Sequence, residues 1–171
     1  VKSSSINSPF KFLLIARMLK DKGVVEYVNA AQMLGKSGVN AEFCLLGFLD
    51  VQNPAAISTE QMKKWTAQGF VKYLGVSDDV RAHISQADCI VLPSYREGTS
   101  NVLLEASSME RPCITCDTTG CREIVEDGVT GYLCKVADAE DLADKMLRII
   151  GLPAENRIDM GKKAREKVIR E

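Results

Sequence analysis

The sequence contains no apolar run that approaches the ~18 residues a membrane-spanning helix requires, and no basic segment followed by an apolar one opens it. It also lacks an excess of charge of either sign, since 22 Lys and Arg stand against 23 Asp and Glu, for a formal net charge of −1. The first absence predicts a protein without a membrane span. The balanced charge gives no indication of a nucleic-acid partner. We expect a cytoplasmic protein.

Histidine is scarce, and the single residue, His83, is interpreted as structural or surface. Cys113, Cys116 and Cys121 lie close together and include a C-x-x-C, but a zinc site of that kind usually needs a second pair of ligands at matching spacing. No Asp-x-Asp is present. We therefore expect no metal site, and we interpret all cysteines as small buried hydrophobic residues in a reducing cytoplasm. The other three, inside apolar runs, are Cys44, Cys89 and Cys134.

The remaining composition is that of a soluble domain, with 46% hydrophobic and 26% charged residues. The polar stretch VKSSSINSP at residues 1–9 resembles a linker, and we interpret it as a cut inside a longer protein. Residues 10–171 are expected to form one domain, because a chain of this length can bury about two-thirds of its unfolded surface.

Short apolar runs recur along the chain, and each is followed by a segment of helical length. Several runs are continuous rather than alternating, as in strands covered on both faces. Strand–helix alternation favours a doubly wound parallel sheet, so we predict an α/β, Rossmann-like domain with about six strands. The predicted strands are Phe10 to Ala16, Ala41 to Leu46, Phe70 to Leu74, Cys89 to Leu92, Pro112 to Cys116 and Gly131 to Val136.

The segments between the strands carry helix signals. Asp78, Asp79 and Asp138 stand where carboxylates suit the exposed N–H groups of a helix start. The last helix clusters Lys and Arg among acids, which indicates either a solvated face or contact with an anionic membrane. The predicted helices are 23–34, 78–86, a helix from about 101, and two C-terminal helices at about 138–150 and 155–170.

Ligands of open α/β sheets bind beyond the carboxyl ends of the strands. The loop from Arg17 to Gly23 follows the first predicted strand and has neither the G-x-G-x-x-G nor the P-loop pattern. It offers Arg17 and Lys22, which suit phosphate oxygens. Solvated loop cations are the alternative. The irregular segment 48–59 follows the second strand, where α/β proteins place binding loops.

The loop from Pro93 to Asn101 combines Glu97, Gly98 and a helix start capped by Thr99 or Ser100. Glu105 borders the apolar face of that helix and leans back toward the loop. Carboxylates accept hydrogen bonds from hydroxyls, while a helix N-terminus binds anions, so a ligand with hydroxyls and a diphosphate fits. A plain amphipathic helix is the alternative. The loop 117–123, in which Gly120 permits a close backbone approach, adds support, although it could be a simple turn before a short helix.

Several motifs in order resemble the C-terminal, donor-binding half of the family-4 retaining glycosyltransferases, whose GT-B architecture places two Rossmann-like domains across a cleft. The resemblance runs from about Phe12 to Ile150, and its Pro-Ser-Tyr-Arg-Glu-Gly form is similar to bacterial enzymes of surface-polysaccharide and lipid-linked glycan assembly that use UDP-hexosamine or UDP-galactose. The motifs are Arg17-x4-Lys22-Gly23, 70–75, 87–94, Glu97-x7-Glu105-Ala106, and Arg111-Pro112 through Gly128-x-x-Gly131.

The resemblance implies roles for individual residues. Arg17 and Lys22 would bind the donor diphosphate and stabilise the departing nucleotide without a metal or other cofactor. Glu97 would lie beside the sugar, Glu105 would accept from the ribose, and the 74–76 turn would lie against the base. The implied catalytic residues are Glu97, Arg17 and Lys22, and the implied donor-binding residues are Arg17, Lys22, Gly75, Val76, Glu97, Gly98, Thr99, Ser100, Asn101 and Glu105.

The sequence also departs from the family pattern. Residues 99–101 replace a bulky residue plus glycine, and Glu110 stands where glycine usually precedes Arg-Pro, so we expect a different geometry at that helix end. We expect the acceptor-binding half and its family histidine to lie outside this sequence, and the fragment alone is expected to be inactive.

The resemblance implies that the full enzyme transfers a hexose or N-acetylhexosamine from a UDP-sugar to a glycan or lipid-linked acceptor. It is compatible with peripheral association at the inner face of the plasma membrane. A non-catalytic nucleotide-sugar or interaction module, and a sugar-nucleotide epimerase of similar architecture, remain as alternatives.

Overall fold

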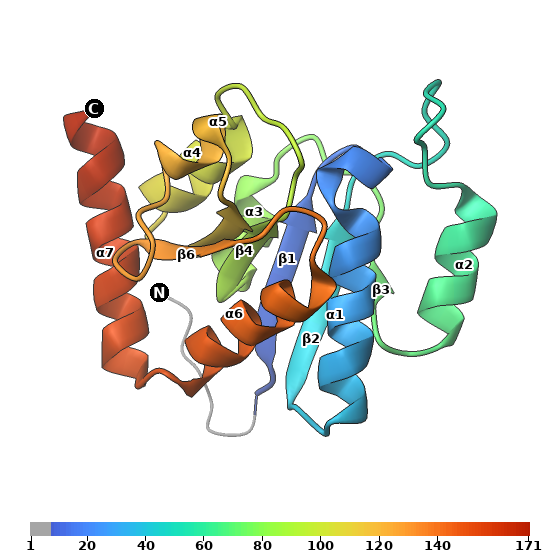
Figure 1. Cartoon of the computed structure of the whole chain (residues 1–171), viewed down its shortest axis with the longest axis horizontal. Helices are drawn as coiled ribbons and strands as arrows, with labels where there is room; N and C mark the ends of the chain where they lie inside the picture. Colours follow the sequence, from blue (N-terminus) through green and yellow to red (C-terminus); the bar gives the residue numbers. More distant parts are fainter. Residues whose placement is uncertain (1–7) are drawn as a thin grey trace.

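The computed structural model describes residues 8–171. These residues form one sheet of six parallel strands, in the order β3-β2-β1-β4-β5-β6, with helices packed around it (Figure 1). The doubly wound α/β prediction is confirmed. Most of the predicted linker, residues 1–7, lies outside the described residues. The strands are β1 (Phe10–Ile15), β2 (Ala41–Leu46), β3 (Lys72–Tyr73), β4 (Cys89–Leu92), β5 (Cys113–Cys116) and β6 (Gly131–Cys134).

Both faces of the sheet are buried, which explains the continuous apolar runs. On β1, Phe12 and Leu14 belong to one core cluster, while Leu13 and Ile15 belong to the cluster on the opposite face. Because successive side chains in this part of the strand enter two cores, its residues are apolar without a break. β3 is shorter than predicted and lies at the sheet edge.

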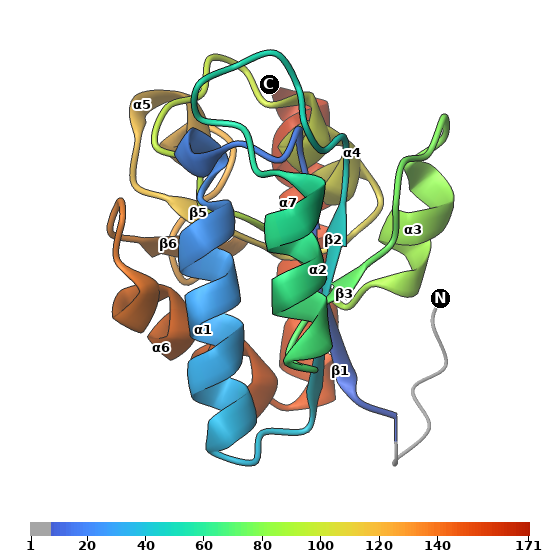
Figure 2. The ribbon, with the colours of Figure 1, turned by 90° about the vertical axis from the view of Figure 1, so that its right-hand side faces the viewer.

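Helices cover the two faces (Figures 1 and 2). α1 and α6 pack side by side on one face, α3, α4 and α5 contribute to the core on the other, and α7 packs against α4. The helices are η1, a 3-10 turn (Lys20–Lys22), α1 (Val24–Lys36), α2 (Thr59–Ala67), α3 (Arg81–Gln86), α4 (Asn101–Ser108), α5 (Thr119–Arg122), α6 (Ala139–Gly151) and α7 (Ala154–Arg170).

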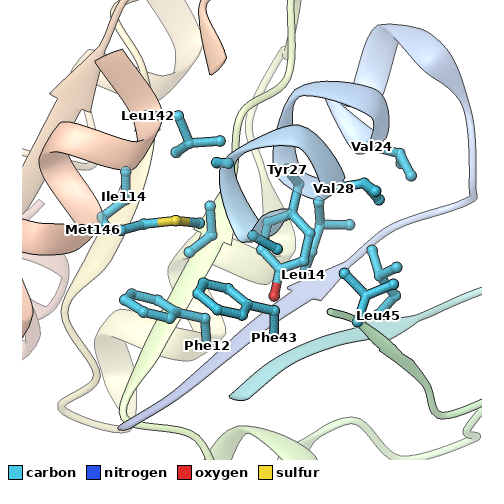
Figure 3. Close-up of a cluster of buried hydrophobic side chains, with 14 of the residues drawn as sticks. Phe12, Leu14, Val24, Tyr27, Val28, Phe43, Leu45, Ile114, Leu142 and Met146 are labelled. Atoms are coloured by element: carbon cyan, nitrogen blue, oxygen red, sulfur yellow. The ribbon is translucent and has the colours of Figure 1, made fainter. Parts of the chain in front are cut away.

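Aromatic rings fill the core beneath α1 (Figure 3). Phe12 on β1 and Phe43 on β2 stack with centroids 5.4 Å apart, and Tyr27 of α1 meets Phe43 edge-on. The buried Tyr27 hydroxyl donates to the Cys44 carbonyl oxygen at 2.9 Å. The hydroxyl is therefore satisfied within the core, and the first turns of α1 are fixed relative to β2.

The helix starts agree with the predicted signals. The Asp138 side chain accepts from the Asp141 amide at 2.9 Å, and Asp79 accepts from the Arg81 amide at 3.0 Å. Both C-terminal helices begin and end within a residue of the prediction. Segment 48–58 is irregular, and Ser58 then caps α2.

The expectation of a different geometry at Glu110 is wrong. Its φ of 60° is the left-handed conformation that glycine would supply after a helix. L residues adopt this conformation at a cost of about 1–2 kcal/mol, which surrounding contacts must offset. The contact here is α7, where a Cβ on Gly161 would lie 2.1 Å from the Glu110 carbonyl oxygen.

All six cysteines are buried and unbridged, as predicted. Burial raises the pKa of the Cys113 thiol to about 12, and the pKa of Cys89 is also raised, again mainly by burial. Within residues 8–171, no cluster of His, Cys, Asp and Glu could hold a metal ion. No helix in the same range is both long and apolar enough to cross a membrane.

Candidate functional site

The loops that follow β1 and β4 are fastened together at the carboxyl edge of the sheet. The Tyr95 amide donates to the Asp21 carbonyl oxygen at 2.8 Å, and the Ser94 hydroxyl donates to the same oxygen at 3.2 Å. A Cβ on Gly23 would lie 2.1 Å from the Pro93 carbonyl oxygen, and its φ is 77°. Glycine is therefore required where the first loop enters α1.

The loop after β5 packs against the loop after β4 in the same way. A Cβ on Gly120 would lie 1.9 Å from the carbonyl oxygen of Gly98 and 2.3 Å from that of Glu97. The close backbone approach expected at Gly120 is thus an approach to another loop of the protein. At Gly98 itself a Cβ would meet no atom of the described chain within 4 Å, so space is open beside this residue.

Lys22 and Glu97 form an ion pair across these loops. The Lys22 Nζ donates to Glu97 Oε1 at 2.7 Å, and their side chains are 20% and 13% exposed. The pair joins residues 75 positions apart in the sequence. Two of the predicted catalytic residues therefore lie in contact. Partial burial weakens competition from water, so their charges act at close range.

Arg17 is held differently. It lies two residues after β1 and its side chain is exposed, with no ion pair among the described residues. The backbone beside it is fixed, because the Met18 amide donates to the Phe48 carbonyl oxygen and the Ile57 amide donates to the Met18 carbonyl oxygen, both at 2.8 Å. Arg17 is thus a solvated cation on an ordered loop.

The start of α4 provides the amides of the site. Of the two predicted caps, Thr99 and Ser100, Ser100 is the N-cap of α4. Its hydroxyl accepts a hydrogen bond from the Leu103 amide at 3.2 Å. Thr99 and Asn101 are exposed. Within the described chain, the Asn101 and Val102 amides have no protein acceptor and stay free for an anion.

Glu105 lies one turn along α4 and is exposed. It contributes to the raised pKa of Arg81 on α3, after the larger effect of Asp79. Glu97 is paired with Lys22, whereas Glu105 forms no ion pair among the described residues.

The turn at residues 74–76, which was predicted to meet the base, follows β3, and β3 is the third strand from β4 in the sheet. Gly75 has a φ of 85°, its carbonyl oxygen accepts from the Gly47 amide at 2.8 Å, and Val76 is 49% exposed. Parallel strands lie about 4.8 Å apart, so the ends of β3 and β4 are roughly 14 Å apart along this edge. The two ends of one extended ligand could reach these separate groups.

Sequence reasoning missed a partly buried polar cluster beside the ion pair. The Tyr95 hydroxyl donates to Glu26 Oε1 at the start of α1, and burial together with this bond raises the Tyr95 pKa to about 12. Glu26 Oε2 and Asp21 Oδ1 are buried without a hydrogen-bond partner. The only signal for Glu26 was an acid in the first turn of an amphipathic helix, which normally indicates a dipole contact.

A family model described as "Glycosyl transferases group 1" matches residues 9–151. A curated relative, the N,N'-diacetylbacillosaminyl-diphospho-undecaprenol alpha-1,3-N-acetylgalactosaminyltransferase of Campylobacter jejuni, is 34% identical over 145 residues. The alignment covers 85% of this chain but 36% of the relative, so the chain spans little more than a third of that enzyme's length.

Solved structures show the same fold. Sucrose-phosphate synthase from Thermosynechococcus elongatus has a TM-score of 0.79 at 27% identity, over 96% of this chain and 41% of that one. Anabaena HepE, solved with UDP-glucose, has a TM-score of 0.81 at 20% identity, over 95% and 44%. The family match covers most of the sequence. The chain belongs to the glycosyl transferases group 1 family.

Proposed function

We propose that this domain binds the nucleotide sugar that donates the sugar in a retaining glycosyl transfer, and that the donor is a UDP-sugar. The observation that carries the proposal is the contact of Lys22 with Glu97 beside the open N-terminus of α4. A cation, a carboxylate and free amides at one point suit the junction of a diphosphate with a sugar, where negative charge adjoins hydroxyl groups.

The order of the strands supports an extended donor. Residues after β4 include Glu97, residues after β1 include Arg17, and residues after β3 include Gly75 and Val76. A donor lying along this edge would have its sugar near β4, its phosphates near β1 and its base toward β2 and β3. Ligands of doubly wound sheets bind where the strand order reverses, which here is between β1 and β4.

Charge stabilisation is the proposed chemical role of the site. When the bond between sugar and diphosphate breaks, negative charge grows on the departing nucleotide. Arg17, Lys22 and the first amides of α4 would stabilise that charge without a metal ion. Glu97 would accept from sugar hydroxyls and orient Lys22, and Glu105 would accept from the ribose hydroxyls.

The activity of the whole enzyme is a further part of the proposal. The relative from Campylobacter jejuni is named as an N-acetylgalactosaminyltransferase acting on an undecaprenol-linked acceptor, and HepE was solved with UDP-glucose. These names support transfer of a hexose or N-acetylhexosamine to a glycan or lipid-linked acceptor bound by another domain. A cytoplasmic enzyme working at the inner membrane face fits such an acceptor.

Isothermal titration of the 171-residue chain with UDP tests the donor site. We expect Arg17→Ala to weaken binding about tenfold or more, because it removes a charged hydrogen-bond donor to phosphate. Lys36→Ala is the matched control, since it removes an exposed cation at the far end of α1. EDTA should change the affinity less than twofold. Unchanged affinity in both Arg17→Ala and Glu105→Gln would contradict the assignment.

A further inference from the structure

Phe48 is the one exposed phenylalanine of the five in the chain, all of which lie in the described residues. It is 58% exposed and lies two residues after β2, at the same edge of the sheet as the candidate site. The other four pack against the core or lie partly buried. An aromatic ring left in water forgoes a large burial area, so its surroundings call for an explanation.

The exposure is not that of a loosely held loop tip. The carbonyl oxygen of Phe48 accepts from the Met18 amide at 2.8 Å. The Gly47 amide donates to Gly75 at 2.8 Å, and the Gly47 carbonyl oxygen accepts from the Tyr73 hydroxyl at 2.6 Å. A Cβ on Gly47 would lie 1.6 Å from the Ala16 carbonyl oxygen. The backbone under the ring is thus tied to the ends of both neighbouring strands.

Phe48 has an apolar neighbour in the fold. Val76 is 49% exposed, and each of the two residues directly follows a glycine, with Gly47 and Gly75 joined by their hydrogen bond. On its other side, the Phe48 carbonyl oxygen accepts a hydrogen bond from the amide of Met18, the residue that follows Arg17. Two exposed apolar residues therefore lie on backbone segments that are hydrogen-bonded to each other and to the loop of Arg17, on the side of β1 away from the Lys22–Glu97 pair.

We propose that Phe48 is the platform on which the base of the donor nucleotide stacks, with Val76 as a second apolar contact. This rests on the proposed function, in which Arg17 holds the phosphates. A nucleoside diphosphate places a flat heterocycle at one end of its phosphates, and an exposed aromatic ring beside a phosphate-binding cation matches that pairing. Stacking tolerates any base, so Phe48 supplies affinity and leaves base selection to other groups.

The test titrates the 171-residue chain with UDP and with inorganic diphosphate, which has no base. Phe48→Ala should weaken UDP binding about 5- to 100-fold, the range typical of aromatic–base stacking, and change diphosphate binding less than twofold. Phe48→Tyr should restore UDP affinity. Ile158→Ala on α7 is the control, since it truncates a similarly exposed apolar side chain (54%) away from the site.

A spectroscopic measurement gives an independent answer. The chain has one tryptophan, Trp65, so Phe48→Trp in a Trp65→Phe background carries a single reporter. Its fluorescence should be quenched by UDP and unaffected by diphosphate. Equal loss of UDP and diphosphate affinity in Phe48→Ala, or UDP affinity within twofold of wild type, would overturn the inference. If Arg17→Ala still weakens UDP binding, the proposed function survives that result; no UDP binding by the wild type would overturn both.

Discussion

The site has two sides that are built differently. On the side of β1, β4 and β5, backbones approach so closely that Gly23 and Gly120 leave no room for a Cβ, and Lys22 is paired with Glu97. On the side of β2 and β3, Phe48 and Val76 are about half exposed. The packed side therefore holds its charged pair in place without a ligand, whereas the open side presents apolar surface that a ligand can cover.

The difference has a physical basis in what each side is proposed to bind. Charge that grows during a reaction is stabilised best by groups already held in place, because no reorganisation is then needed at that moment. Contact with a flat base needs apolar area rather than fixed dipoles. The paired charges of Lys22 and Glu97 on one side and the exposed apolar side chains on the other agree with this division.

The largest expected effect comes from a methyl group on the packed side. Gly120→Ala would place a Cβ 1.9 Å from the Gly98 carbonyl oxygen, so we expect the free energy of unfolding to fall by about 3 kcal/mol. Gly98→Ala is the matched control, because its Cβ would meet no atom within 4 Å, and it should cost under about 1 kcal/mol. Urea denaturation measures both. Equal losses would mean that the close approach of Gly120 to the Gly98 carbonyl oxygen does not tighten the packed side.

A smaller effect separates two tyrosine hydroxyls, one on each side. Tyr95 donates to the Glu26 carboxylate, while Tyr73 donates to the Gly47 carbonyl oxygen. Hydrogen bonds to charged groups contribute more than neutral ones, so Tyr95→Phe should lower the free energy of unfolding by about 2 kcal/mol and Tyr73→Phe by about 1 kcal/mol. Urea denaturation at neutral pH provides the comparison.

The Tyr95 contribution should also depend on pH. Burial, with the bond to Glu26, raises the folded-state pKa of Tyr95 to about 12 from its usual 10. The contribution is fully present below pH 10 and is lost as pH rises toward 12. The difference in unfolding free energy between wild type and Tyr95→Phe should therefore shrink across that interval. Buried cysteines that titrate in the same range are present in both proteins, so their effects cancel except for the interaction of Cys116 with Tyr95. A constant difference would exclude the Tyr95–Glu26 bond.

The strands and loops could be predicted because their causes are local. Continuous apolar runs identify strands buried on both faces, and all parallel strands end at one edge, which brings the loops at Arg17, Glu97 and Gly120 together. Ser100 could be predicted as one of two caps because its cause is also local. A hydroxyl just before a helical apolar pattern can accept a hydrogen bond from an amide in the first turn of that helix.

Contacts between distant segments could not be predicted in this way. Lys22 and Glu97 are 75 positions apart, and the sequence around either residue does not predict that the two side chains pair. Gly120 was expected to admit a close approach, but only the fold shows that Gly98 is what approaches. At Glu110, family likeness predicted a changed helix end. Packing against α7 instead holds a non-glycine residue in the glycine conformation.

The smallest expected effect compares two serine caps. Ser100 caps α4 on the packed side and is 5% exposed. Ser58 caps α2 at the end of the segment that follows β2, on the open side, and is exposed. Each hydroxyl accepts a hydrogen bond from a backbone amide. Water can replace the hydroxyl at Ser58 but has little access at Ser100. Ser100→Ala should therefore cost about 1.5 kcal/mol and Ser58→Ala about 0.5 kcal/mol by urea denaturation. If Ser58→Ala proved the costlier, water would reach the start of α4, and burial would not distinguish the two sides there.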